Sequence, residues 1–145
     1  MGGVDKIDQL EIRLLLTAPT LTDSEQYMLE LINRARANPA AEAARYSIGL
    51  NDGVPSADTI STSPKQPLAP QQQLGTAAAL HSQDMLDRDF FDHTTLGSGT
   101  SFDERVTNQG YIWNLVAENI GYAAKTITAS QTVYMDEIHE GLIRS

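Results

Sequence analysis

Residues 111–121 decide the fold class, and they read YIWNLVAENIG. Aromatic and branched side chains make up much of this run, and such residues are enriched in β-strands. The run therefore predicts a strand. Because a single strand cannot form a sheet, we expect the segments that pair with residues 111–121 to be missing from this chain.

The rest of the chain has helical patterns. Thr22 and Glu25 form a Thr-x-x-Glu capping box, which is typical of a helix start. The Asn-Pro pair at 38–39 predicts the end of that helix, because proline disfavours helical geometry in the residue before it. Ser101 and Glu104 predict a second capping box. The other predicted elements are helices at residues 40–46, 71–88 and from about Thr128, a short helix that Gly110 ends, and a surface loop at 47–70.

The composition indicates one globular domain with a packed core. The chain has 145 residues, of which 41% are hydrophobic and 20% are charged, as in ordinary folded domains. Its formal net charge of -9 repels phosphate backbones and anionic lipid headgroups, so we expect no nucleic-acid partner. Cysteine is absent, so any bound metal must have nitrogen and oxygen ligands.

Residues 1–21 are predicted to be an N-terminal extension. Their one apolar cluster, at residues 12–16, is interrupted by an arginine. It is much shorter than a membrane-spanning helix or the core of a secretory signal. We therefore expect no integral membrane segment, and no signal peptide is visible. The residues alone leave the cellular compartment open.

The three histidines are the first candidates for chemistry. His81 lies on the apolar side of a predicted helix, which favours a core histidine that is bonded to the backbone. His93 follows two phenylalanines in a polar turn where packing has no evident need for it, so a ligand or catalytic role competes with a structural one. His139 lies beside Glu140, at the edge of the apolar stripe of the last helix.

Glu118 is the most unusual carboxylate, because it interrupts the apolar run at residues 111–121. If its side chain faces inward, it needs a cation or several hydrogen bonds to offset its desolvation. The alternative is a solvated glutamate on the outer face of the strand. One histidine with two carboxylates would suit zinc or another borderline divalent ion, whereas calcium requires more oxygen ligands.

Several segments, taken in order, resemble the CAP superfamily, which groups cysteine-rich secretory proteins, antigen 5 and plant pathogenesis-related proteins. The closest likeness is to its bacterial SCP-like branch. The segments that carry it are the opening helix EQYMLELINRAR at 25–36, a second helix at 68–85, the histidine turn Phe91-Asp92-His93, the Gly-Glu-Asn-(Ile/Leu) strand, here Ala117-Glu118-Asn119-Ile120, and the helix end at 139–145.

This resemblance implies an α+β fold, namely an α-β-α sandwich that is rich in helices, with part of its central sheet missing from this chain. The family-like domain would span residues 22–145. It is expected to be incomplete at its C-terminus, because the family's Gly-His-Arg segment and later strands would follow. Family members have a central cleft lined by two histidines and two glutamates, which bind zinc or calcium in some of them.

Matched to the family pattern, His93 corresponds to the first cleft histidine and Glu118 to the first glutamate. The second glutamate is ambiguous: distance from Glu118 favours Glu140, while an aromatic residue three positions earlier favours Glu137, and His139 is a neighbouring alternative. The metal ligands implied by the resemblance are therefore His93, Glu118 and Glu140, and the ion is zinc or calcium.

The resemblance favours an extracellular, secreted-type binding domain whose solvent-facing cleft holds a divalent metal and a small or lipid-like ligand. It assigns no reaction. One alternative is a metal-assisted hydrolase in which Glu118 acts as general base. The other alternative is a structural or interaction domain without an active cleft.

Overall fold

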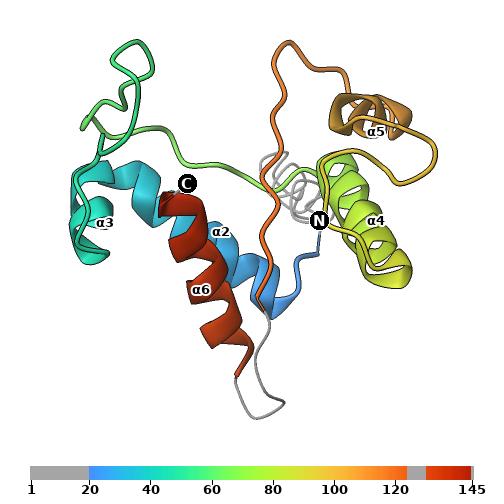
Figure 1. Ribbon diagram of the computed structural model, residues 1–145, viewed down its shortest axis with the longest axis horizontal. Helices are drawn as coiled ribbons and strands as arrows, with labels where there is room; N and C mark the ends of the chain where they lie inside the picture. The colour runs from blue at the N-terminus through green and yellow to red at the C-terminus, as the bar shows by residue number, and fades with distance from the viewer. Residues whose placement is uncertain (1–19, 124–129, 145) are drawn as a thin grey trace, which may run out of the picture. The chain divides into compact units, whose positions relative to one another are not determined.

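The computed structural model describes residues 20–123 and 130–144, which form helices joined by irregular segments (Figure 1). The contacts divide the chain into two compact units. The first unit contains Pro70–Glu118, and the second contains Leu21–Ala69 with Asn119–Ser145. The helices are α2 (Asp23–Ala37), α3 (Pro39–Arg45), α4 (Gln72–Arg88), α5 (Phe102–Asn108) and α6 (Gln131–Arg144).

In the second unit, α2 packs against α6 and α3. The predicted capping box is confirmed: the Glu25 amide donates to Thr22 Oγ1 at 3.3 Å, and the Thr22 amide donates to Glu25 Oε2 at 2.8 Å. Leu31 is buried in this unit. The Tyr27 hydroxyl donates to Asp136 Oδ1 of α6 at 2.9 Å, so a polar contact joins two helices that Figure 1 draws side by side.

The loop predicted at 47–70 is confirmed, since α3 ends at Arg45 and α4 begins at Gln72. Asn33 of α2 fastens the far end of this loop through two hydrogen bonds. Its Nδ2 donates to the Leu68 carbonyl at 3.0 Å, and its Oδ1 accepts from the Leu68 amide at 2.7 Å. The Asn33 side chain therefore satisfies both backbone hydrogen-bonding groups of Leu68, which lies outside any helix.

In the first unit, α4 and α5 pack together and bury Ala77, His81 and Val106. The second predicted capping box is present, with the Ser101 amide donating to Glu104 Oε2 at 3.0 Å. Gly110 follows α5 at a φ of 77°, a left-handed conformation that glycine adopts without strain. The predicted end of this helix is therefore confirmed.

The predicted α+β sandwich is wrong for the described residues, which contain helices but no strand. Residues 111–121 form no ladder, and the Tyr111 amide at their start donates to the Val106 carbonyl of α5 at 3.4 Å. A strand forms only when its backbone pairs with another strand, and no described segment pairs with this one. Two of its apolar side chains are consequently almost fully exposed, Ile112 at 93% and Leu115 at 92%.

Two further expectations concern residues that lie partly outside the described ranges. Residues 1–19, which make up nearly all of the predicted N-terminal extension, lie outside the described residues, as does Thr128, the expected start of the last helix. The described part of that helix, α6, begins at Gln131. None of the helices described in residues 20–123 and 130–144 is long and apolar enough to cross a membrane.

Candidate functional site

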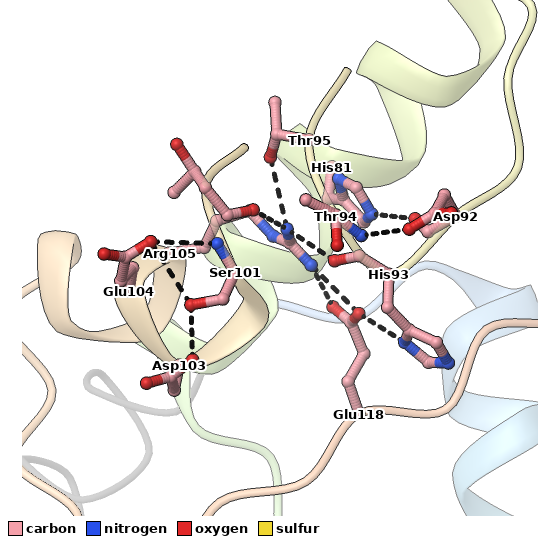
Figure 2. A network of polar contacts seen from close by, with 11 residues as sticks. His81, Asp92, His93, Thr94, Thr95, Ser101, Asp103, Glu104, Arg105 and Glu118 are labelled. Atoms are coloured by element: carbon pink, nitrogen blue, oxygen red, sulfur yellow. Dashed lines mark hydrogen bonds and ion pairs between the residues drawn. The ribbon is translucent and has the colours of Figure 1, made fainter. Parts of the chain in front are cut away.

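The structure brings His93 and Glu118 together in the first unit (Figure 2). His93 lies in the turn that follows α4, and Glu118 lies in the extended segment that follows α5. Their contact joins His93 Nδ1 to Glu118 Oε2 at 2.9 Å. Two residues that are 25 positions apart in sequence therefore form one histidine–carboxylate pair.

Arg105 supplies the cation that an inward-facing Glu118 requires. Its Nη2 donates to Glu118 Oε1 at 2.8 Å and to Oε2 at 2.9 Å. The two side chains are only 11% and 18% exposed, respectively. A single nitrogen of Arg105 thus contacts both carboxylate oxygens, and a charged hydrogen bond of this kind is stronger than a neutral one. The solvated outer-face alternative for Glu118 is therefore wrong in this structure.

Arg105 is not among the site residues predicted from the sequence. The signal that could have found it is the unpaired charge itself: a carboxylate within an apolar run requires a cation, and Arg105 is the nearest arginine in the sequence. Arg105 lies directly after Glu104 of the predicted capping box, so its place on a short helix was known. What the pattern could not give was the direction of that helix toward Glu118.

Arg105 also holds the turn around His93. Its Nη1 donates to the His93 carbonyl at 2.9 Å and to the Thr100 carbonyl at 3.1 Å, with a longer contact of 3.2 Å to Thr95 Oγ1. One guanidinium therefore binds both the Glu118 side chain and the backbone that carries His93. The ion pair and the conformation of the turn depend on the same residue.

The hydrogen-bond pattern defines the tautomer of His93. A carboxylate that is paired with an arginine only accepts hydrogen bonds, so the proton of the 2.9 Å contact must lie on His93 Nδ1. In the neutral ring, Nε2 then has a free lone pair. The His93 side chain is 53% exposed, and Figure 2 shows its second ring nitrogen turned away from Glu118. Such a nitrogen can bind a metal ion or accept a proton.

His81 is the core histidine that its place on α4 predicted. It is 3% exposed, and its Nε2 lies 2.9 Å from the Asp92 carbonyl oxygen. This contact with the backbone confirms the structural interpretation of His81 as it was made from the sequence. It also connects α4 with the residue that directly precedes His93.

Glu140, Glu137 and His139 all lie on α6, in the second unit. Glu140 Oε1 accepts from Arg144 Nε at 2.7 Å, and this ion pair is exposed. Glu137 is exposed. His139 is buried instead, with its Nε2 3.1 Å from Glu42 Oε1. Among the described residues, no three histidine, cysteine, aspartate or glutamate side chains are grouped to hold a metal ion.

A charge cluster formed by Arg34, Glu42 and His139 stabilises the second unit; Glu42 and His139 are buried, whereas the Arg34 side chain is 39% exposed. Arg34 donates to Glu42 through Nε at 2.8 Å and Nη2 at 2.5 Å. These hydrogen bonds lower the pKa of the Glu42 carboxyl, against the opposing effect of burial. This cluster is not predicted from the sequence, because Glu42 occurs in an alanine-rich helix where a single charge normally faces solvent.

A hollow of about 550 Å³ lies in the loop that carries His93. Phe91 and Leu96 give it an apolar wall, and Asp92 adds a carboxylate. The complete lining is Phe90, Phe91, Asp92, Thr94, Thr95, Leu96, Gly97 and Gly99. Its volume is within the range of small-molecule pockets.

These helices and this histidine turn match a known family. A comparison with protein-family models matches residues 29–140 to CAP: Cysteine-rich secretory protein family. Since this match covers well over half of the sequence, the chain belongs to the CAP family. The comparison with curated proteins and the comparison with solved structures each gave no match.

Proposed function

We propose that this CAP-family domain is a binding module in which His93 binds a divalent metal ion. The observation that carries this proposal is the 2.9 Å contact between His93 Nδ1 and Glu118. Metal-binding histidines commonly donate their other ring nitrogen to a carboxylate, which fixes the tautomer and makes the ligand more basic. The exposed Nε2 of His93 has the lone pair that such a site requires.

The donor chemistry favours zinc over calcium. Zinc accepts imidazole nitrogen, whereas calcium takes six to eight oxygen ligands. Arg105 already engages both oxygens of Glu118, at 2.8 and 2.9 Å, so Glu118 is better suited to orient His93 than to act as a strong direct ligand. The first unit thus fits one nitrogen ligand, His93, and the carboxylate that orients it, Glu118.

The small or lipid-like ligand is proposed to bind in the hollow beside the site. Support comes from the apolar side chains of Phe91 and Leu96 in its lining, both of which are more than a third exposed. Ligand pockets combine such apolar walls with a few polar groups that set orientation. An extracellular location is part of the same proposal, and it rests on the family's description as secretory proteins.

The metal proposal is tested by titrating zinc, and separately calcium, into metal-free protein while following thermal unfolding. Binding to the folded state stabilises it by about 2.7 kcal/mol at a free ion concentration of one hundred times Kd. We expect zinc to raise the unfolding midpoint of the wild type and to leave that of His93→Ala unchanged. Asp58→Asn, a substitution in the exposed loop of the second unit, is expected to respond as the wild type does. An equal zinc response in His93→Ala would contradict the proposal.

The histidine–carboxylate pair also supports the hydrolase alternative in a modified form. A histidine whose Nδ1 is held by a carboxylate is oriented to take a proton at Nε2. The contacts of Glu118 with Arg105 favour His93 rather than Glu118 as the general base. The same His93→Ala variant serves this alternative, because any hydrolysis that the domain performs should disappear with the imidazole.

A further inference from the structure

His81 contacts the backbone carbonyl of Asp92, directly before His93, where it can restrain the orientation of the His93 side chain. The Asp92 carbonyl oxygen is only an acceptor, so the 2.9 Å contact requires a proton on His81 Nε2. Phe90 packs against the imidazole of His81 with ring centroids 5.9 Å apart and planes at 65°. The ring of His81 is therefore held by α4, by an aromatic neighbour and by one directed hydrogen bond.

This hydrogen bond fixes one of the two peptide planes that meet at His93. The Asp92 carbonyl and the His93 amide belong to the same planar peptide unit, so His81 restrains the plane before His93. The His93 carbonyl belongs to the next unit, and Arg105 Nη1 binds it at 2.9 Å. Because the backbone has only two soft torsions at each residue, restraint of both planes fixes the direction in which the His93 side chain leaves the backbone.

Packing alone does not explain a histidine at position 81. Its Nδ1 is buried and has no hydrogen-bond partner among the described residues. An unsatisfied buried acceptor costs about 1–3 kcal/mol, a penalty that phenylalanine would avoid at similar size. What histidine adds at this position is the Nε2 donor that reaches Asp92.

We propose that His81 is a positioning residue for His93: it holds the turn so that Nδ1 of His93 contacts Glu118 and Nε2 faces the metal ion. This inference rests on the proposed function in one respect, which is that Nε2 of His93 binds the metal ion. The hydrogen bond of His81 goes to the Asp92 carbonyl and not to Glu118 or Arg105. Its effect on the site passes through the Asp92 carbonyl.

The test uses the long-range proton–nitrogen NMR spectrum of the imidazoles, together with the zinc Kd, in the full chain. His81→Phe and His81→Leu remove the donor, and His81→Gln keeps an N–H donor the same number of bonds from Cα as Nε2 of His81. We expect His93 to carry its proton on Nδ1 in the wild type and in His81→Gln. In the two apolar variants we expect a mixture of tautomers and a zinc Kd about tenfold weaker, as for other partners that orient metal ligands.

Each outcome is decisive. A folded His81→Phe or His81→Leu variant with an unchanged His93 tautomer and an unchanged zinc Kd would show that His81 only fills the core. Loss of the fold in both apolar variants would assign His81 a structural role and would equally overturn the proposal. If the wild type binds no zinc, the proposed function fails, but the tautomer comparison still tests His81 by itself.

Discussion

Arg105→Gln is expected to lower the free energy of unfolding by about 3 kcal/mol, because it leaves a largely buried carboxylate without its cation. The same substitution removes the hydrogen bonds from Arg105 to the His93 and Thr100 carbonyls. Urea unfolding followed by circular dichroism measures the loss. Arg105→Lys should recover part of it, since lysine keeps the charge but has no second nitrogen to bind the His93 and Thr100 carbonyls while the first binds Glu118.

An exposed ion pair in the same unit provides the matched control. Asp84 pairs with Arg88 on the surface of α4, with side chains 30% and 39% exposed. Exposed pairs of this kind contribute little to stability because solvent screens them, so Asp84→Asn should have a small effect. If Arg105→Gln costs no more than Asp84→Asn, the buried ion pair with Glu118 does not form as described.

Glu42→Gln is expected to destabilise the second unit by about 2 kcal/mol at neutral pH, which is the usual contribution of hydrogen bonds to a charged group. The Glu42 side chain is 3% exposed, whereas the side chain of its partner Arg34 is 39% exposed, so the loss is that of the charged hydrogen bonds and not of the compensation of a second buried charge. Hydrogen bonds from Arg34 hold the pKa of Glu42 below its ordinary value of 4.5. A lowered pKa in the folded state stabilises the fold above pH 4.5, and this contribution disappears as the pH falls through the folded-state pKa.

The difference between wild type and Glu42→Gln should therefore be constant above about pH 5 and should shrink at lower pH. Urea midpoints measured from pH 7 to pH 3 give this difference directly, since the other carboxyls titrate in both proteins. Glu30→Gln is the control, because Glu30 is exposed on the same helix as Arg34. A gap between wild type and Glu42→Gln that stays constant down to pH 3 would rule out Glu42 as the titrating group.

The helices could be predicted because their determinants are local. Thr22 with Glu25, Ser101 with Glu104, and the Asn-Pro pair at 38–39 each act within four residues of one another, which is the distance over which helix starts and ends are decided. Whether residues 111–121 form a strand cannot be decided from local patterns in this way. Strand propensity describes how well side chains fit a pleated surface, and no described segment provides that surface.

The candidate site was predictable only in part, namely where a residue stands out in its local sequence. His93 and Glu118 are conspicuous one at a time, because each is a polar side chain in a context that does not need it. The contacts themselves are seen only in the folded structure: Arg105 lies 13 residues from Glu118, and, in the second unit, Glu42 lies 97 residues from His139. Local sequence patterns contain no information on contacts at such separations.

The most direct test of the site is the tautomer of His93 in the wild-type protein. With only three histidines in the chain, a long-range proton–nitrogen spectrum of the imidazoles can be assigned by comparison with His93→Ala. The geometry at Glu118 predicts that the His93 proton lies on Nδ1 and that the unprotonated Nε2 signal shifts when zinc is added. A proton on Nε2, or equal exchange between the two nitrogens, would contradict the histidine–carboxylate pair on which the proposed function depends.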